Sequence, residues 1–166
     1  MTALTPPTYS YAINDAPGVV AANNFVSFFN PVGSGKIMLV FQATVATYAV
    51  GVSTTDTSMT VRLLTSASGG SPVAANTIYP LRSDWPDPVV EVRIGNPATS
   101  LAVYGTLASF PPASTSGVGG GESASVTTPT ATGVPYAPGE GLVFLTAAGN
   151  TNQRWNVLFI WAEVDI

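Results

Sequence analysis

Hydrophobic side chains alternate with period two in run after run of this chain, and turn-forming clusters separate the runs. The clearest run is KIMLVFQATVATYAV, at residues 36 to 50. Its odd-numbered members share one side of an extended chain: Ile37, Leu39, Phe41, Ala43 and Val45. Period two with many β-branched and aromatic residues is typical of a β-strand, so the sequence predicts one long strand here.

Seven more runs have the same character, at residues 24–30, 57–64, 88–94, 100–107, 122–128, 141–147 and 154–164. Turn-forming clusters such as SASGGSP, GNPATS and GNTNQ lie between them. No segment carries an apolar stripe with helical spacing, and 14 prolines and 16 glycines would interrupt helices. The pattern predicts an all-β fold, a single-domain antiparallel β-sandwich, with the jelly roll as its natural eight-strand form.

The 166 residues suit one domain with a single hydrophobic core. Residues 1–22 contain Pro6-Pro7 and Pro17-Gly18, and we interpret them as an extended N-terminal arm that could lie on a neighbouring subunit. The sandwich would then occupy residues 23–166. Within it, FPPASTSGVGGG at residues 110–121 predicts a flexible loop.

Charge is unusually scarce. Lys and Arg number 5 and Asp and Glu 9, together 8% of the chain, while 46% is hydrophobic; soluble domains typically carry about 25% charged residues. A surface this poor in charge would be weakly protected against association, so we expect much of it to contact neighbouring proteins. A net charge of -4 and a lone lysine argue against nucleic acid as a partner.

The chain has neither cysteine nor histidine. These absences remove disulfides, thiolate nucleophiles, the commonest general base and the commonest zinc ligands. We therefore expect no cofactor, no metal and no enzymatic activity. The first residues lack the basic and apolar regions of a signal peptide, and no apolar stretch is long enough to span a membrane, so no membrane association is expected.

The segment NPVGSGK, residues 30–36, superficially resembles a phosphate-binding loop. Such a loop requires glycine where this chain has Asn30, and a hydroxyl residue where it has Ile37. It must also open a helix, whereas this segment opens a predicted strand. We interpret it as a turn between two strands, with Lys36 as a solvated charge at a sheet edge.

The stretch RSDWPDPVVEVR concentrates most of the charge in the middle of the chain. Asp84, Asp87 and Glu91 lie near Trp85, and paired carboxylates beside an aromatic ring are used by glycosidases. The same carboxylates could ligate calcium. In the structural alternative, Trp85-Pro86 and Asp87-Pro88 shape a loop and the two arginines of the stretch pair locally with the acids.

Apolar residues occupy both faces of the C-terminal run QRWNVLFIWAEV. Such a strand is buried on two sides, and we expect the core on one side and a subunit contact on the other. The aromatic candidates for core or interface positions are Tyr9, Tyr11, Phe28, Phe29, Trp85, Trp155 and Trp161. No side chain is singled out as catalytic.

Four pieces, FVSFFNPVGSGK, VVEVRIGNP, APGEGLVFL and QRWNVLFIWAE, together resemble a pattern found in small structural proteins of tailed bacteriophage virions. The resemblance spans Asn24 to Glu163. It implies a β-sandwich that binds the major capsid protein or other virion proteins and stabilises the lattice as a decoration or cement protein. It also implies a homo-trimer, located in the virion after assembly in the host cytoplasm.

The resemblance leaves a second role open, that of a tail or fibre component that binds a receptor or a glycan. That role predicts exposed aromatic rings, such as Trp85 or Tyr104, near Asp84 and Asp87. A third hypothesis, an enzyme acting through Asp84, Asp87 and Glu91, would be excluded if these side chains lie far apart or pair entirely with Arg82 and Arg93.

Overall fold

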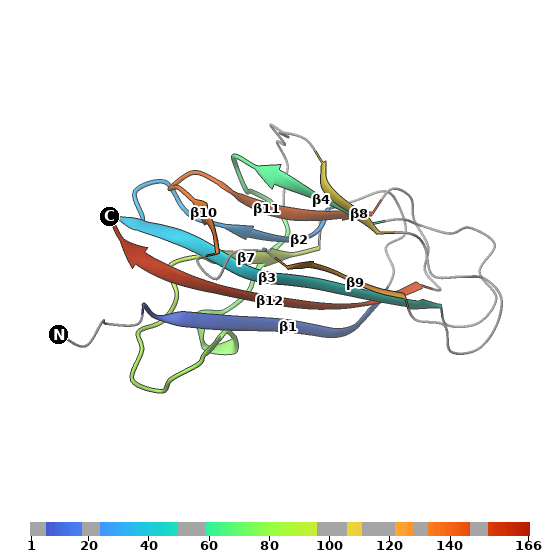
Figure 1. Cartoon of the computed structure of the whole chain (residues 1–166), viewed down its shortest axis with the longest axis horizontal. Helices are drawn as coiled ribbons and strands as arrows, with labels where there is room; N and C mark the ends of the chain where they lie inside the picture. Colours follow the sequence, from blue (N-terminus) through green and yellow to red (C-terminus); the bar gives the residue numbers. More distant parts are fainter. Residues whose placement is uncertain are drawn as a thin grey trace.

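A computed structural model describes residues 6–17, 24–49, 59–95, 106–110, 122–127, 133–146 and 153–166. Two antiparallel sheets lie one over the other (Figure 1). Sheet A runs in the order β10 (Val134–Tyr136), β3 (Lys36–Ala49), β12 (Gln153–Asp165), β1 (Thr8–Pro17) and β6 (Tyr79–Pro80), and β9 (Glu122–Thr127) also pairs with β3. Sheet B runs in the order β5 (Ser71–Pro72), β7 (Glu91–Ile94), β2 (Asn24–Phe29), β11 (Gly141–Thr146), β4 (Met59–Leu64) and β8 (Thr106–Phe110).

The predicted all-β sandwich is confirmed. All eight predicted runs contain or overlap a strand, and the long run at 36–50 becomes β3 (Lys36–Ala49). Strands β1, β5, β6 and β10 were not predicted; three of these have only two or three residues. Among the described residues the only helical turn is η1 (Ala75–Thr77).

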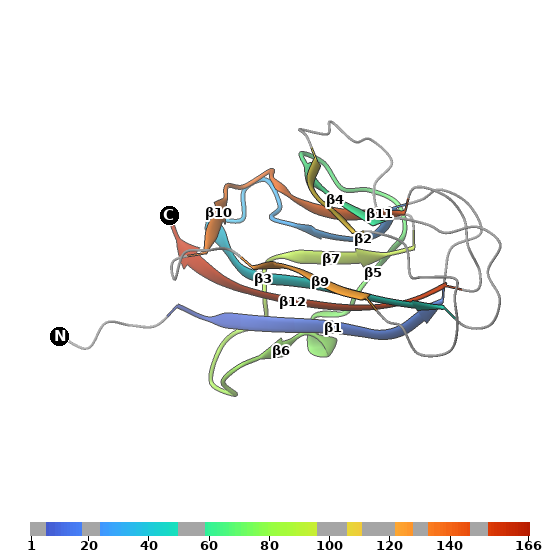
Figure 2. The same cartoon turned by 45° about the vertical axis from the view of Figure 1, so that its right-hand side comes forward.

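The predicted N-terminal arm is wrong for residues 8–17. These residues form β1, which pairs with β12 along its length and with β6 through Tyr9 and Ser10 (Figure 2). The prolines suggested an arm, but the alternation between them places Tyr9, Tyr11 and Ile13 against the core. Residues 1–5 and 18–22 lie outside the described part, as do residues 111–121 of the predicted loop.

Aromatic rings dominate the core between the sheets. Phe28 of β2 stacks on Phe159 of β12, with ring centroids 3.7 Å apart, so the contact joins the two sheets. Phe144 meets the edge of Phe28, and Tyr9 packs beside Trp161 at 5.5 Å between centroids. Offset and edge contacts of this kind add stability beyond the burial of apolar area, by about 0.5–1.5 kcal/mol per pair.

A β-bulge in β3 breaks the alternation that the sequence suggested. Ile160 pairs with Gln42 whereas the next residue, Trp161, pairs with Val40, so Phe41 is the extra residue. Buried positions therefore change from even to odd numbers along β3, with Met38 and Val40 before the bulge and Ala43 after it. The prediction that Phe41 and Ala43 share a face is wrong for this reason.

Candidate functional site

The NPVGSGK segment is a connection between β2 and β3, as predicted. The amide of Ser34 donates to the carbonyl of Pro31 at 3.0 Å, and Gly33 and Gly35 have φ of 80° and 67°. Positive φ at these positions explains why glycine occurs there. Lys36 opens β3 and forms an exposed ion pair of 2.5 Å with Asp165 at the end of β12, so its charge has a partner.

Asn30, the residue that replaces the required glycine, is completely buried and organises this end of the sandwich. Its side-chain Nδ2 donates to the carbonyls of Lys36 at 2.8 Å and Tyr136 at 3.1 Å. Its backbone amide donates to the carbonyl of Glu140 at 2.9 Å, and its carbonyl accepts from Gly139 at 2.7 Å. One residue thus ties the turn before β3 to the turn before β11.

In the RSDWPDPVVEVR stretch, two of the three carboxylates, those of Asp84 and Glu91, form ion pairs with nearby arginines. Arg82 binds both carboxylate oxygens of Asp84, at 3.0 and 2.8 Å, and its guanidinium lies 5.5 Å from the ring centre of Trp85. The hydrogen bond from Arg82 lowers the pKa of Asp84 below its usual value.

Arg93 forms an ion pair with Glu91 and also donates to the carbonyl of Gly69 at 2.7 Å. Local pairing of this kind is the structural alternative that the sequence offered, and it counts against a catalytic pair. Within the described ranges, no group of three or more Asp or Glu side chains is placed to hold a metal ion.

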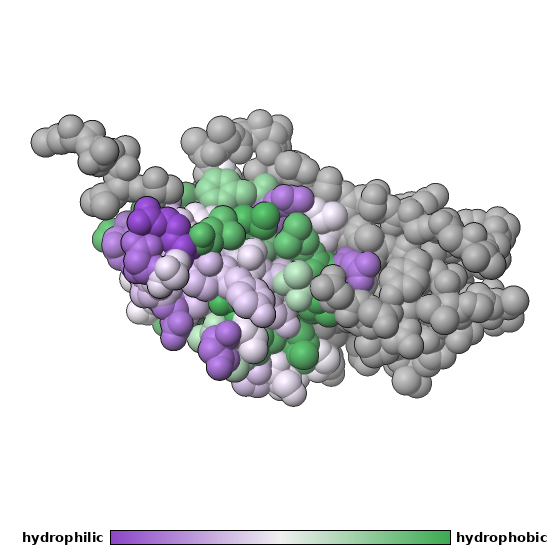
Figure 3. All heavy atoms as spheres, turned by 90° about the horizontal axis from the view of Figure 1, so that it is seen from below, coloured by the Kyte–Doolittle hydropathy of each residue, from purple (hydrophilic) through white to green (hydrophobic). Residues whose placement is uncertain are grey.

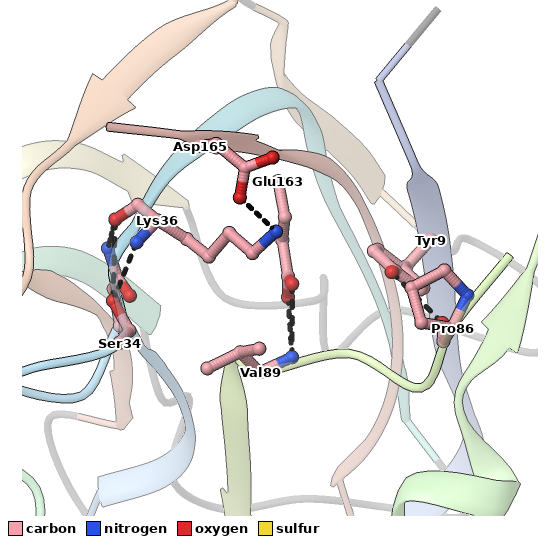
Figure 4. A network of polar contacts seen from close by, with 8 residues as sticks. Tyr9, Ser34, Lys36, Pro86, Val89, Glu163 and Asp165 are labelled. Atoms are coloured by element: carbon pink, nitrogen blue, oxygen red, sulfur yellow. Dashed lines mark hydrogen bonds and ion pairs between the residues drawn. The ribbon is translucent and has the colours of Figure 1, made fainter.

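A buried carboxylate that the sequence analysis did not single out fixes the same stretch to the sandwich (Figure 4). Glu163 of β12 is 3% exposed and accepts from the amides of Val89 and Val90, each at 2.9 Å, and from the indole of Trp161 at 3.2 Å. A lone acid inside the apolar run WAEV was the available signal. Several N–H donors satisfy this carboxylate, so its role here is structural.

Tyr9 and its neighbour Thr8 make a second set of hydrogen bonds that hold this stretch against the sandwich. Its hydroxyl donates to the carbonyl of Pro86 at 3.0 Å, and the amide of Leu81 donates to the carbonyl of Thr8 at 2.9 Å. Burial, with the nearby charges of Glu163 and Asp87, raises the pKa of Tyr9 to about 12. Residues 81–90 are therefore held against β1 and β12 at several points.

The aromatic candidates have different positions in the fold. Tyr9, Phe28 and Trp161 are core residues, and Tyr11 packs against that core while half-buried. Phe29 lies with Leu64 and Val143 in a second cluster on the outer side of sheet B. Trp85 is half-buried under Arg82. Trp155 pairs with Ala16 and Thr47, and its side chain, like all of Tyr104, is outside the described part.

The outer face of sheet A carries no charge at its centre. We use this name for the outward residues of β1, β12 and β3 in two cross-strand rows: Ser10, Ile160 and Gln42, and Ala12, Leu158 and Thr44. All six are half-buried or exposed, whereas Phe159 and Trp161, between and beside them on β12, are fully buried. Figure 3, seen from the β1 side, shows pale and green residues over much of the described surface, with the largest group of strongly hydrophilic residues at one end and smaller groups elsewhere.

The outer face of sheet B differs from that of sheet A. There Phe29, Leu64 and Val143 are at most 8% exposed, and Ala67 from the segment after β4 packs against them. The chain itself therefore covers part of this side. On sheet A, the two cross-strand rows lie on the side away from sheet B, so the core does not cover them.

Comparisons with known proteins add no assignment: no family model matches the chain, and no similar curated protein or solved structure was found. In the part of the chain that the structure describes, no helix has the length and hydrophobicity needed to cross a bilayer.

Proposed function

We propose that this protein is a structural component of a virus particle, with a jelly-roll fold that binds and stabilises the capsid lattice as a decoration or cement protein. The strand pairing supports the jelly roll. Strand β1 pairs with β12, β2 with β11, β3 with β9 and β10, and β4 with β8, which is a nested order. A long hairpin rolled into two sheets has this order, and viral capsid proteins and lectins both use it.

A fold alone does not assign a function, so the proposal depends on a surface. The observation that carries it is the uncharged outer face of sheet A, where Leu158 and Ile160 lie among Ser, Ala, Thr and Gln. Depletion of charge marks the centres of protein interfaces. Long pairing of β12 with both β3 and β1 makes this face a rigid platform.

The partner in this proposal is the major capsid protein or another virion protein, and the protein acts as a homo-trimer within the virion. A closed symmetric oligomer would place several copies of the outer face of sheet A on a lattice that has matching symmetry. The scarcity of charge over the whole chain, 8% of residues, supports a surface that neighbouring proteins cover.

Lysine substitutions on this face provide the test. Purified protein is added to particles that lack it, and bound protein is measured by co-sedimentation. We expect Ser10→Lys and Leu158→Lys each to weaken binding by about tenfold or more, because a buried unpaired charge costs several kcal/mol. Ser10→Lys removes no apolar contact, so it separates lost docking from a weakened fold.

Val32→Lys is the matched control, because Val32 is 82% exposed in the turn between β2 and β3 and is not one of the six residues that define the outer face of sheet A. Its binding should equal that of the unaltered protein, and thermal unfolding should confirm the fold of every variant. If both lysine variants on sheet A bind particles as well as the control does, the proposed docking face is wrong.

A receptor- or glycan-binding module on a tail or fibre is the second candidate. It is favoured by side chains in and just before the segment 81–90 that is held against β1 and β12: Tyr79 is 69% and Leu81 57% exposed, and Trp85 is half-buried beside Arg82. Aromatic side chains on a rigid loop suit stacking against sugar rings. Saccharide binding on a glycan array that Trp85→Ala abolishes would support this role, whereas an array without signal would count against it.

A further inference from the structure

A pocket of about 310 Å³ opens between β10, a terminal strand of sheet A, and the last residues of β4, which lie beyond those that pair with β8. Its walls include Leu63 and Leu64 from β4 and Val134 and Pro135 from β10. Pockets that hold small ligands or single side chains of a partner begin at about 300 Å³ and are mostly apolar with a few polar groups. This pocket has that size and that composition.

Glu140 is the only charged residue among the described residues that line the pocket, and its charge is negative. Glu140 lines it together with Tyr136, and one oxygen of the Glu140 carboxylate accepts from the amide of Ala137 at 2.8 Å. No Lys or Arg among the described residues forms an ion pair with Glu140. Burial and the charge of Glu140 raise the pKa of Tyr136 to about 12, so its phenol stays protonated near neutral pH.

Backbone hydrogen bonds hold both polar residues in position. The carbonyl of Glu140 accepts from Asn30 at 2.9 Å, its amide donates to Ala137 at 3.0 Å, and Gly139 has φ of 91°. The side chain of Asn30 donates to the carbonyl of Tyr136. A site held in this way loses little conformational entropy when a ligand binds.

We propose that the pocket between β4 and β10 binds an aliphatic chain that ends in a positive charge, the chemistry of a lysine side chain or a free alkylamine. The aliphatic walls remove the chain from water, and the ammonium group pairs with the Glu140 carboxylate. The same carboxylate repels carboxylates and phosphates. This inference does not depend on the proposed particle role.

A matched ligand series tests the inference: pentylamine, pentanol and pentanoate, which share one alkyl chain and differ in charge. Binding is followed by amide chemical shifts in the full-length protein labelled with nitrogen-15. We expect pentylamine to bind with a Kd of about 1 mM, with shifts confined to residues 63–65 and 134–141. Pentanol should bind more weakly, pentanoate should not bind, and salt should weaken the amine alone.

Glu140→Gln is the decisive variant, and it should weaken pentylamine binding by about three- to tenfold while leaving pentanol unchanged. Asp87→Asn is the control, because it removes the same net charge from an exposed position in another loop. Equal affinity of Glu140→Gln and the unaltered protein for pentylamine, or binding of pentanoate as tight as that of pentylamine, would overturn the inference.

The two sources of the ligand are separated with N-acetyl-lysine methylamide, which presents the lysine side chain on a peptide backbone. If it shifts the same amides as pentylamine, the pocket accepts a lysine of a partner protein. If only pentylamine does, the pocket accepts small free amines. If neither shifts these amides, the inference is wrong.

Discussion

Asn30 shows how one side chain can organise two turns that are more than 100 positions apart in sequence. Its Nδ2 group supplies both hydrogens to backbone carbonyls, of Lys36 and Tyr136, in a completely buried position. Its Oδ1 has no hydrogen-bond partner among the described atoms. Without Asn30, the Tyr136 carbonyl would lose this donor and the Lys36 carbonyl would keep only the bond of 3.4 Å from the Ser34 hydroxyl. The contribution of Asn30 therefore depends on the two hydrogens that it donates.

We predict that Asn30→Ala lowers the free energy of unfolding by about 2–4 kcal/mol, because the buried Tyr136 carbonyl loses this donor and the part-buried Lys36 carbonyl keeps only the longer bond from the Ser34 hydroxyl. Ser34→Ala in the same turn is the control, since the side chain of Ser34 bonds only to the backbone of Lys36, accepting from its amide at 3.2 Å and donating to its carbonyl at 3.4 Å. That variant should cost about 0.5–1.5 kcal/mol. Urea unfolding measures both, and equal losses would contradict the role given to Asn30.

Tyrosine ionisation should make the protein sensitive to alkali. Burial raises the pKa of both Tyr9 and Tyr136 from 10.0 to about 12, so the folded state holds these protons more tightly than the unfolded chain does. Their contribution to stability is therefore complete below pH 10 and is lost as the pH rises to about 12. Denaturant unfolding at a series of pH values should show a decline in that window.

Tyr9→Phe isolates one of these two contributions. The variant loses the hydrogen bond to Pro86 and is less stable at neutral pH, but its stability should fall less steeply between pH 10 and 12. Absorbance titration of the phenolate gives an independent reading of the same ionisation. A slope equal to that of the unaltered protein would show that the Tyr9 proton is held no more tightly in the folded state.

Because β1 is part of sheet A, deleting the N-terminal residues would not test particle binding alone. On the arm hypothesis, removing residues 1–22 would test particle binding and leave the fold intact. In the structure, β1 lies inside sheet A between β12 and β6, and Tyr9 is 1% exposed. Such a deletion removes a core residue and uncovers one side of β12, so loss of binding would follow from loss of the fold.

We predict that a chain lacking residues 1–17 does not unfold cooperatively, because β12 would lose a ladder partner and the core would lose Tyr9. A synthetic peptide of residues 6–17, added in excess, should restore a cooperative transition by re-forming the pairing with β12. Circular dichroism during heating measures both states. A truncated chain with an unchanged unfolding midpoint would show that β1 is dispensable.

The period-two runs predicted most of the strands, because alternation along one strand is a local property of the sequence. The bulge at Phe41 could not be predicted from the sequence, because it exists only relative to the pairing of β3 with β12. The strand β1 was missed for a related reason: its pairing partner lies at the other end of the chain. Prolines on both sides of β1 suggested an arm, and only pairing with β12 shows that the segment belongs to sheet A.

In the part of the molecule that the structure describes, the two sheets have unlike outer faces. On sheet B, the segment after β4 packs over Phe29, Leu64 and Val143, while the outer face of sheet A carries uncharged side chains across three strands. Both faces contain apolar residues in the sequence, so hydrophobicity alone does not distinguish them. The asymmetry is why the lysine variants on sheet A are the sharpest test of the proposed capsid contact.

Composition and local pattern determined the fold class, the turn at NPVGSGK and the shortage of catalytic side chains, because each depends on residues close in sequence. The three-dimensional arrangement decided which apolar face is core, placed Glu163 over the amides of Val89 and Val90, and brought Tyr136 and Glu140 to one pocket beside β4. These outcomes depend on contacts between distant segments, where register and burial are set jointly by both partners and cannot be read from either one.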